Sequence, residues 1–596
     1  MEEHFGRDVT EEAADAAASS PLTEHGAAAV RRDVWPHATW LTSGPALPSA
    51  PQTLAGCGVQ ERLITRWREV QAEDAAAAAK LKRGTAAWDS SGGHAGADLG
   101  GGAGGDFVSA EQQELFNVCR SYKDLLFPCR PYPLSAEAPD ALLDAVLLHC
   151  LAHVGAAAAA IKRNSERLKG GETGVTGAAE APRDQGFTRP KVLLLLPLRS
   201  LALRATTRLA ALAQRETRAD SIQGKQRLVE EFGAPSDEES GAPGARGRGG
   251  SAPGKPAEHA ALFAGNSDDH FRFGVKITRG AVRLFADFYQ ADVIMASPLG
   301  LSTALSAAAK EGGGATDFLS SIEIAAVDRA DVMLMQNWAH VTAVFEALNR
   351  LPEAQHGADI MRVRPAALAG RARHVRQTIL LASFASAELN ALARGCANVA
   401  GRARLQPTYE GVLGSVLPRV RQLFERFRAP SAAGEADARF AHFCRIVWPR
   451  MREAGTSGQL LFVPSYFDYV RMRALAKAEG AEFAALSEYA KPQEAARARS
   501  RFADGRLRLA MTTERAHFFL RIRMRGVREL VVYQVPEHAH FYAELVNLLD
   551  SADASAVAPT VTVLFSRFDA ARLERVVGRA RAERMLSSAA ATFVLC

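Results

Sequence analysis

Two carboxylates near the middle of the chain have the position of a metal-binding pair. Residues 320–338 read SSIEIAAVDRADVMLMQNW, and a short apolar run, 322–327, ends at Asp328 with Asp331 one turn further on. An apolar run bounded by polar residues predicts a buried parallel strand, with Asp328 at its carboxyl end. Ligands of open α/β sheets bind at this edge, and nucleotide-hydrolysing enzymes place there an aspartate that holds magnesium on the phosphates. Magnesium-dependent nucleotide hydrolysis is therefore the first chemistry to test.

The residue after Asp328 argues against a metal site. Where such enzymes carry a second acid, this chain has Arg329. A guanidinium at that point favours an ion pair with Asp328 or Asp331 over coordination of a metal. We therefore expect a structural role for Asp328, Arg329 and Asp331.

Hydrolysis also requires a loop that cradles the phosphates, with the pattern GxxxxGK[ST]. The sequence contains a GxxxxGK at 249–255, but Pro256 replaces the Ser or Thr, and the match lies in a flexible low-complexity segment. Upstream of Leu193, where the loop is expected, residues 149–165 predict a helix without a glycine-rich turn. The sequence thus predicts no catalytic residue, no cofactor and no bound metal.

Other candidate ligands have simpler explanations. His149 and His153 have the spacing of a zinc pair, but the glutamate of HExxH is missing and no third ligand is evident. Core or capping histidines fit better. The carboxylates of Asp268 and Asp269 could bind a cation, yet a polar turn that caps the next element is the preferred interpretation.

Arginine is concentrated in one part of the chain. The net charge is only +6, but between about residues 360 and 530 basic residues outnumber acidic ones about two to one, nearly all as arginine. The forked guanidinium suits phosphate contacts, so a phosphate-rich partner is indicated. A GC-rich genome, which favours Arg and Ala codons, is the competing explanation.

Within that part, TERAHFFLRIRMRG places Arg521, Arg523 and Arg525 at alternate positions. In an extended strand the three would share one face, and Phe518 and Phe519 would either stack on bases or fill the core. RNA contact is slightly preferred over solvated surface charge.

Length and composition set the class of protein. The 596 residues are 47% hydrophobic with a mean hydropathy of −0.09, which predicts a soluble protein of two or three domains. No apolar run approaches the roughly 20 residues of a membrane span, and the acidic first residues do not predict a secretory signal. The seven cysteines contain no CxxC pair, so we expect reduced structural thiols. An intracellular protein without a membrane partner is expected.

Alternating strands and helices predict the fold class. Apolar runs that read as strands are each followed by a helical stretch, which is typical of α/β domains with parallel sheets. Eight such strands are expected, at 192–196, 292–296, 322–327, 378–382, 459–463, 507–512, 529–533 and 560–565.

These strands divide the chain into four parts. We expect a disordered Ala/Gly-rich region at 1–105, a first domain at 106–395 with a flexible insertion at 236–258, a basic connector at 396–440, and a second domain at 441–596. The connector is expected to contain a helix in VLPRVRQLFERF.

The order of the loops resembles that of two-domain RecA-like RNA helicases of the DEAD-box type. PLRSL at 197–201 resembles the PTREL loop that grips the RNA backbone, and SPLG at 297–300 resembles the TPGR loop. DRAD at 328–331 stands where DEAD would be, which the resemblance makes a degenerate motif. It also makes Arg199 and Ser297 candidate RNA contacts.

In the second domain, TT at 512–513 with RG at 525–526 resembles T-D-x-x-x-R-G with an insertion, and RVVGRAR at 575–581 resembles HRxGRxGR with altered spacing. The candidate RNA contacts of this domain are Arg515, Arg521, Arg523 and Arg525.

Longer segments resemble one family. YKDLLFPCRPYP, FAGNSDDHFRFGVKI, DFLSSIEIAAVDRADVMLMQNWAHV, VPSYFDYVRMR and TTERAHFFLRIRMRGVRELVVYQVPEHAHFY together resemble the U3 small nucleolar RNA-associated protein 25 family, also called digestive organ expansion factor. The resemblance runs from about Phe107 to Phe593. It implies a nucleolar component of the small-subunit processome, needed for the pre-rRNA cleavages that release 18S rRNA, with a DEAD-box-like fold that lacks the ATPase residues.

The leading hypothesis is therefore a non-enzymatic scaffold in the nucleolus, with pre-rRNA, U3 snoRNA and processome proteins as partners and no small-molecule substrate. The competing hypothesis is an ATP-dependent RNA helicase with an atypical phosphate loop. A third is a fold that docks on proteins alone.

Overall fold

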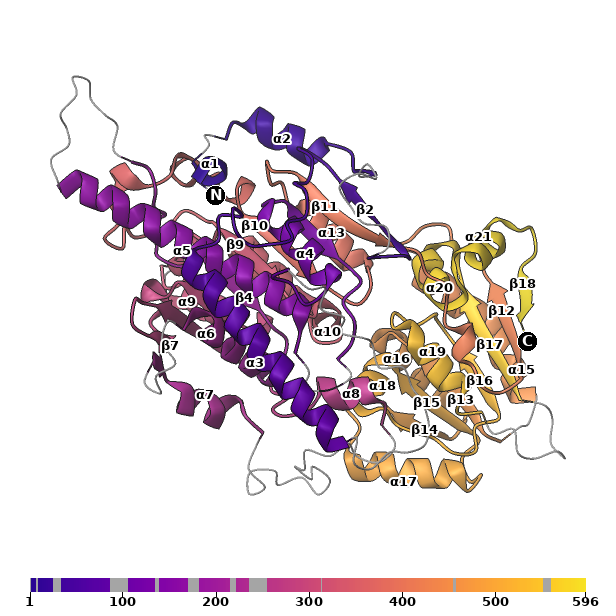
Figure 1. Cartoon of the computed structure of the whole chain (residues 1–596). Coiled ribbons are helices and arrows are strands. Elements are labelled where there is room, and N and C mark those ends of the chain that lie inside the picture. The colour runs from indigo at the N-terminus through magenta and orange to yellow at the C-terminus, as the bar shows by residue number, and fades with distance from the viewer. Residues whose placement is uncertain are drawn as a thin grey trace. The chain divides into compact units, whose positions relative to one another are not determined.

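The computed structural model describes residues 2–6, 9–24, 34–85, 105–133, 135, 139–169, 182–214, 221–234, 255–311, 314–453, 457–549 and 559–595. These residues belong to two compact units, Met1–Pro407 and Thr408–Cys596. The bar in Figure 1 follows the first from indigo into orange and the second on to yellow. Each unit is described by itself.

The first unit is built on an eleven-stranded sheet in the order β1-β2-β11-β3-β10-β9-β4-β8-β6-β7-β5. The six strands from β11 to β8 are parallel: β3 (Asp124–Phe127), β4 (Val192–Leu195), β8 (Val293–Ala296), β9 (Ile324–Val327), β10 (Gln377–Leu381) and β11 (Arg402–Pro407). Outer strands extend both sides of the parallel core: β1 (Thr23–Glu24), β2 (Ala38–Thr42), β5 (Ile222–Gln223), β6 (Arg272–Ile277) and β7 (Val282–Ala286).

Helices cover both faces of this sheet, because successive side chains of each buried strand point to opposite faces. One apolar core joins the sheet to α3 (Glu61–Thr85), α4 (Ala110–Arg120), α5 (Ala141–Lys169) and α6 (Arg199–Ala213). The other core joins it to α9 (Pro298–Glu311), α10 (Ala330–Leu334), α11 (Trp338–Ala347) and α13 (Ala387–Gly395). In Figure 1, α6 lies beside both α3 and α5, as their contacts require.

The second unit has a seven-stranded sheet in the order β14-β15-β13-β16-β17-β12-β18. All strands are parallel except the last, β18, which pairs with β12 in the antiparallel sense. The strands are β12 (Arg421–Arg426), β13 (Gln459–Val463), β14 (Phe483–Leu486), β15 (Leu509–Thr513), β16 (Glu529–Val532), β17 (Thr560–Phe565) and β18 (Thr592–Leu595).

Helices again lie on both faces of the second sheet, with a core on each face. They are α14 (Glu435–His442), α15 (Trp448–Glu453), α16 (Tyr466–Ala478), α17 (Pro492–Ala503), α18 (Glu514–Leu520), α19 (Ala539–Val546), α20 (Ala570–Val577) and α21 (Arg579–Ser587). The segment LERVVGRARAERML forms two helices, α20 and α21, because the helical conformation is interrupted at Gly578, where φ is +87°.

The α/β class with two parallel-rich sheets is confirmed, and each of the eight predicted strands is present, as β4, β8, β9, β10, β13, β15, β16 and β17. Each was visible because its apolar run is nearly continuous, as expected of a strand buried on both faces.

Two strands were mistaken for parts of helices. The helical pattern of EQQELFNVCRSYKDLLF ends at Arg120, and a turn with Tyr122 at φ +58° leads into β3. In VLPRVRQLFERF the structure has β12 rather than a helix. Both segments are too short for periodicity to distinguish a strand from a helix.

The domain organisation also differs from the sequence-based expectation. Part of the region 1–105 is built into the first unit, since β2 pairs with β11 and Trp67 of α3 is fully buried. The connector 396–440 is divided, because β11 belongs to the first sheet and β12 to the second. Residues 86–104, and the insertion 236–258 up to residue 254, lie outside the described residues.

Among the described residues, α5 has the length and apolarity of a membrane span, which corrects the expectation that no segment does. Its most apolar window has a mean hydropathy of 1.7, and 78% of that window is buried inside the molecule, as in a core helix. Alanines and two histidines interrupt the larger apolar residues and concealed the run. The six described cysteines are free thiols.

Candidate functional site

The carboxyl ends of β3 and β10 are where a ligand of this sheet would bind. After β3 the chain crosses β10 and β9 to reach β4, towards one end of the sheet. After β10 it crosses β3 to reach β11, towards the other end, so the direction of winding reverses between β3 and β10. Crevices for ligands form at such a switch point. The loop from β3 to α5, residues 128–140, therefore stands where a phosphate loop would stand, and it contains three prolines between residues 128 and 133 and no glycine.

This placement corrects the sequence-based search, which placed the loop upstream of Leu193. That segment lies inside α5. The error follows from the missed strand β3: without it, no strand-turn-helix unit could be recognised there.

A buried arginine occupies the switch point. Arg130 is 2% exposed and donates from Nε to Oδ1 of Asp328 over 2.8 Å, and from Nη1 to Oδ1 of Asp140 over 2.6 Å. Its backbone N–H donates to the carbonyl of Ala382, directly after β10. The side chain and backbone of Arg130 thus join the loops that follow three adjacent strands.

The two acids around Arg130 are engaged by its guanidinium. Burial opposes ionisation of Asp140, but the charge and hydrogen bonds of Arg130 outweigh burial and lower the pKa of Asp140. Asp328 is 4% exposed and accepts from two nitrogens of the same guanidinium. Its oxygens are therefore engaged by a cation of the chain itself, in the position where magnesium would sit in a hydrolase.

Asp331 and Arg329 do not form the expected pair. Asp331 is fully buried and accepts from the hydroxyl and the backbone N–H of Ser383, over 2.6 and 3.1 Å. Arg329 has a left-handed backbone, φ +58°, and donates to the carbonyl of Pro131. The sequence correctly suggested an arginine beside Asp328, but the partner is Arg130, because the backbone turn directs Arg329 to the β3–α5 loop instead.

The two candidate RNA contacts of the first unit are engaged inside it. Arg199 pairs with Asp268 at 2.8 Å and donates to the carbonyls of Glu231 and His270. Ser297 is fully buried, and its hydroxyl accepts from the backbone N–H of Gly300. Both therefore organise loops in this conformation, and neither presents a free polar group to RNA.

The four candidates of the second unit do not form one surface. Arg521 ends α18 with φ +44°, is 8% exposed, and pairs with Glu544 at 3.3 Å. Arg515 is half-buried and lies 3.8 Å from Glu488. Arg523 and Arg525 are exposed. The predicted strand over 521–525 is absent, because α18 ends at Leu520 and the chain continues without regular structure.

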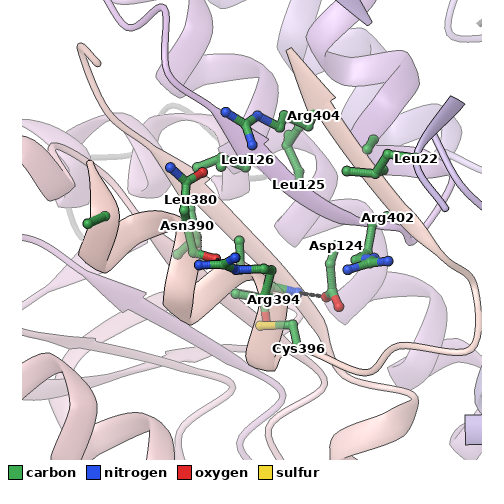
Figure 2. A pocket seen from close by; sticks show the side chains of 14 residues that line it. Leu22, Asp124, Leu125, Leu126, Leu380, Asn390, Arg394, Cys396, Arg402 and Arg404 are labelled. Carbon is green, nitrogen blue, oxygen red and sulfur yellow. Dashed lines mark hydrogen bonds between the residues drawn. The ribbon is translucent and has the colours of Figure 1, made fainter. Parts of the chain in front are cut away.

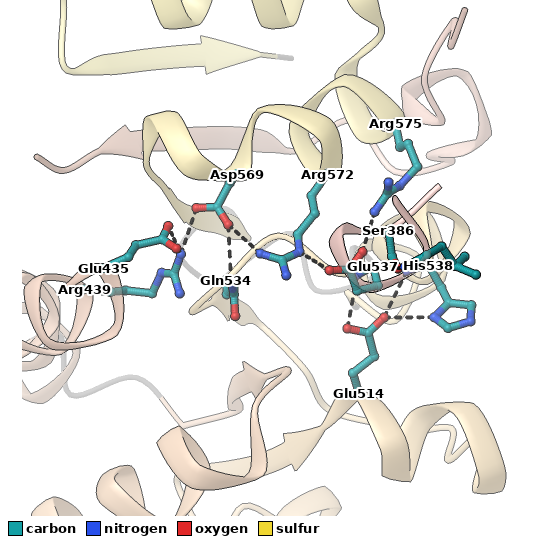
Figure 3. A network of polar contacts seen from close by, with 11 residues as sticks. Ser386, Glu435, Arg439, Glu514, Gln534, Glu537, His538, Asp569, Arg572 and Arg575 are labelled. Carbon is teal, nitrogen blue, oxygen red and sulfur yellow. Dashed lines mark hydrogen bonds and ion pairs between the residues drawn. The ribbon is translucent and has the colours of Figure 1, made fainter. Parts of the chain in front are cut away.

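The carboxyl edge of the second sheet holds a second network of arginines and acids (Figure 3). Asp569, fully buried after β17, accepts from Arg439 at 2.8 Å and from Arg572 at 3.0 Å. Arg572 also contacts Glu537, and Arg575 donates to the same carboxylate over 2.6 Å.

A third acid completes this network. Glu514, 2% exposed, accepts from the backbone N–H of His538 over 3.0 Å. Of the whole set, Arg575 belongs to the motif RVVGRAR that was noted in the sequence. The other members come from separate loops with no fixed spacing, so no sequence signal could have grouped them.

The two histidines of α5 belong to the core. His149 contacts the side-chain amide of Gln377 at 2.7 Å, and burial lowers its pKa to about 3, so the ring is neutral. His153 lies 2.8 Å from Glu323, which also pairs with Lys191 at 2.8 Å. These partners are protein groups on several elements, as in a structural cluster.

A cavity of about 270 Å³ opens in the first unit between α13 and the strands β3, β10 and β11 (Figure 2). Asp124 lines it, is 5% exposed, and accepts from the backbone N–H of Thr378 over 2.7 Å. Its other oxygen has no hydrogen-bond partner among the described residues. Burial raises the pKa of Asp124 to about 6, despite the opposing effects of Thr378 and Arg376.

Comparison with known families gives two matches that together span most of the chain. The model described as "UTP25, NTP hydrolase-like domain" matches residues 122–403, and "Utp25, C-terminal domain" matches residues 412–595. The boundary between them coincides with the boundary between the two units.

Individual relatives agree. Protein NUCLEOLAR FACTOR 1 of Arabidopsis thaliana is 38% identical over 83% of this chain and 66% of the relative. The U3 small nucleolar RNA-associated protein 25 homolog of Homo sapiens is 37% identical over 80% of this chain and 62% of the relative. The Schizosaccharomyces japonicus protein of that name is 36% identical over 80% of this chain and 71% of the relative. The chain thus spans less than two thirds of the length of the Arabidopsis and human proteins.

Among solved structures, the RNA helicase Prp28 from Chaetomium thermophilum is 13% identical, with 89% of this chain and 88% of that chain covered and a TM-score of 0.27. A score so low supports no argument. The RecA-like character of the first unit is supported instead by its own strand order and by the NTP hydrolase-like family model.

Removing the charge of Arg130 is expected to destabilise the first unit strongly. Arg130→Met leaves the buried Asp328 and the half-buried Asp140 without their cation, and breaking a buried pair from one side costs about 3–5 kcal/mol. Adding D140N and D328N to R130M removes the uncompensated charges, so the triple variant should be more stable than R130M alone. Urea unfolding, monitored by hydrogen exchange in β4 and β9, measures the stability of the first unit in each variant.

Lys162→Met is the matched control, because Lys162 pairs with Glu166 of the same helix and both side chains are exposed, so its loss should cost at most about 1 kcal/mol. If the effects of R130M and D140N/D328N simply add, the three side chains are not one coupled unit.

Asp124→Asn is expected to stabilise the first unit above pH 6. The folded-state pKa of about 6 exceeds the ordinary value of 3.8, so between these two pH values the folded state binds more protons than the unfolded state. Stability of the unsubstituted protein therefore falls as the pH rises through this window. Asparagine keeps the acceptor for Thr378 and has no charge to bury, so its advantage should grow to on the order of 3 kcal/mol.

Thermal unfolding of both proteins between about pH 4 and pH 8 measures the difference. A difference in Tm that does not change with pH would contradict the raised pKa.

Proposed function

The chain is a member of the U3 small nucleolar RNA-associated protein 25 family, and from that premise we propose that it is a non-catalytic ribosome-biogenesis factor of the nucleolus. It acts as an RNA-binding scaffold of the small-subunit processome, in the processing of pre-rRNA to 18S rRNA. Its relatives are named for association with U3 small nucleolar RNA or as a nucleolar factor. Its partners in this proposal are pre-rRNA, U3 snoRNA and processome proteins.

The observation that carries the non-catalytic assignment is the contact of Arg130 with Asp328 and Asp140. Magnesium and phosphates can bind at this edge only if Arg130 leaves Asp328, which is buried, and Asp140, which is half-buried. Breaking a buried pair from one side costs about 3–5 kcal/mol before any ligand binds. The prolines of the β3–α5 loop also remove backbone N–H donors where a phosphate loop needs them.

The second network supports the same proposal from the other unit. Arginines that follow the last parallel strand of a helicase-like domain serve the transition state of phosphoryl transfer when they are free to reach the nucleotide. Here Arg572 and Arg575 are held by Asp569 and Glu537 of their own unit. Such an arrangement stabilises the fold and leaves these cations without a catalytic task.

The alternative, an ATP-dependent RNA helicase with an atypical phosphate loop, is favoured by one observation, the NTP hydrolase-like description of the first family model. That description concerns the fold, and fold alone does not establish the chemistry.

RNA binding is proposed for exposed cations rather than for the whole set of six. Arg523 and Arg525 are exposed and remain candidates. Arg199, Ser297 and Arg521 are held by their own unit, and Arg515 is half-buried beside Glu488. RNA contact through these four would require their loops to rearrange.

Titration with ATP and magnesium is expected to give no saturable binding at concentrations up to about 1 mM, the range of substrate affinities of working enzymes. The physical reason is the occupied switch point. Isothermal calorimetry with the full chain measures it. Saturable micromolar binding that Asp328→Ala abolishes, and that the control Arg189→Ala retains, would establish the helicase alternative instead.

Ultraviolet cross-linking in purified pre-ribosomal particles is expected to join pre-rRNA or U3 snoRNA to peptides that contain Arg523 and Arg525. The peptide that contains the buried Ser297 should stay free of RNA and serves as the internal control. RNA adducts on neither unit would contradict the RNA-binding part of the proposal and favour a scaffold that contacts proteins alone.

A further inference from the structure

The amino edge of the second sheet, opposite the edge described above, is assembled from two arginine-bearing segments, 501–508 and 523–528. The N–H of Gln459 at the start of β13 donates to the carbonyl of Arg508 over 2.8 Å. The N–H of Arg528 donates to the carbonyl of Gly458 over 2.8 Å. A Cβ on Gly458 would lie 2.3 Å from the carbonyl oxygen of Gly526, so the two segments meet at this glycine.

This location differs from the one that the sequence motif implies. In the resemblance to T-D-x-x-x-R-G, residues 525–526 would lie at the carboxyl edge near 512–513. In the structure, α18 carries the chain away from that edge, and the segment 523–528 leads into the start of β16.

Exposed arginines alternate with buried apolar residues in both segments. In the first, Arg506 and Arg508 are exposed while Leu507 is 4% exposed. In the second, Arg523 and Arg525 flank Met524, which is 7% exposed. The buried side chains anchor each segment, and the guanidiniums point outwards. We call the four exposed residues the amino-edge arginines: Arg506, Arg508, Arg523 and Arg525.

The amino-edge arginines differ from the arginines of the carboxyl-edge network in having no acidic partner. Across the described residues, no carboxylate lies within 4.0 Å of any of the four, whereas Arg439, Arg572 and Arg575 each contact at least one. From residue 497 to 528 the only acids are Asp504 and Glu514, and Glu514 is buried. The two segments therefore carry an excess of positive charge.

A cavity of about 340 Å³ lies at the same edge. Arg506 and Arg508 line it together with Arg452, Trp448 and Glu482. Arg452 is paired with Glu479 at 3.0 Å, and Glu482 lies 3.9 Å from Arg501. Two unpaired guanidiniums beside a polar hollow give a polyanion both charge and a place to approach closely.

The surface suits a nucleic acid better than a protein. None of the exposed large apolar side chains of the described residues belongs to segment 501–508 or 523–528. Protein interfaces have apolar or aromatic anchors at their centre, whereas phosphate backbones are held by cations spaced along a line. The forked guanidinium is the side chain suited to phosphate.

We propose that the amino edge of the second sheet is an RNA-binding surface, where the amino-edge arginines hold the sugar-phosphate backbone of single-stranded RNA around the cavity. This inference rests on the proposed function, an RNA-binding scaffold, and locates its RNA contact. It places the RNA at the edge opposite to the one that a helicase uses, so the blocked carboxyl edge and RNA binding are compatible.

Binding of a fluorescein-labelled uridine oligonucleotide of about 20 nucleotides to the full chain tests the proposal, since site sizes of single-strand binding folds reach about 16 nucleotides. The double variant R506Q/R508Q is expected to bind roughly tenfold more weakly at about 100 mM salt. The slope of log Kd against log salt should fall in magnitude by about 1.4, because about 0.7 is lost for each phosphate contact to a single strand. Fluorescence anisotropy between about 50 and 200 mM salt provides both values.

R167Q/K169Q is the matched control, because it removes two exposed positive charges at the end of α5 in the first unit. It should bind like the unsubstituted chain. R515Q removes a charge near the carboxyl edge of the second sheet, so it tests whether RNA binds at that edge instead of the amino edge.

If R515Q weakens binding and R506Q/R508Q leaves both affinity and salt slope unchanged, the inference is overturned while an RNA-binding function stands, and the arginine surface is left to an acidic protein. If the unsubstituted chain binds no RNA even at low salt, the proposed function and the inference fail together. An equal loss in R506Q/R508Q and R167Q/K169Q would show unspecific charge attraction and would also overturn the inference.

Discussion

The contact of Arg130 with Asp328 and Asp140 holds together the loops at the centre of the first unit. Burying a guanidinium alone costs free energy, and Arg130 is only 2% exposed. Asp328 and Asp140 offset this cost because they meet the guanidinium in a forked geometry. The three residues come from the β3–α5 loop, the start of α5 and the end of β9. The positions of these loops and the hydrogen bonds of both acids thus depend on the side chain of Arg130. It occupies the place that the metal and phosphates have in a hydrolase.

The same physical solution appears at the carboxyl edge of the second sheet with other residues. Asp569 is fully buried between Arg439 and Arg572, and Glu537 joins Arg572 to Arg575. A nucleotide site needs cations and carboxylates that are free in the absence of ligand. Both edges instead satisfy these groups within the chain, which fits a fold retained for its architecture and its surfaces.

The distribution of arginines follows from this. Most arginines that the helicase-like motifs single out are internal structural groups, whereas the amino-edge arginines are exposed and have no carboxylate partner among the described residues. Alternation of Arg with Leu or Met in short segments anchors the backbone and turns the charges outwards. A function in RNA binding can therefore persist on a surface that nucleotide chemistry never required.

The sequence by itself determined the α/β class, the eight strands with continuous apolar runs, the missing phosphate-loop pattern and the family resemblance, because these are properties of local composition and order. It did not determine β3 or β12, whose four and six residues fit either periodicity. It also suggested Arg329 as the partner of Asp328 or Asp331, whereas Arg130 is the partner of Asp328. Only the tertiary structure decided that Arg130, 198 residues away, is that partner, that Arg199 and Ser297 are engaged internally, and that Arg523 and Arg525 lie at the amino edge. The physical reason is that side-chain pairing depends on which strands become neighbours and on where the backbone turns, and neither is encoded in the spacing of residues along the chain.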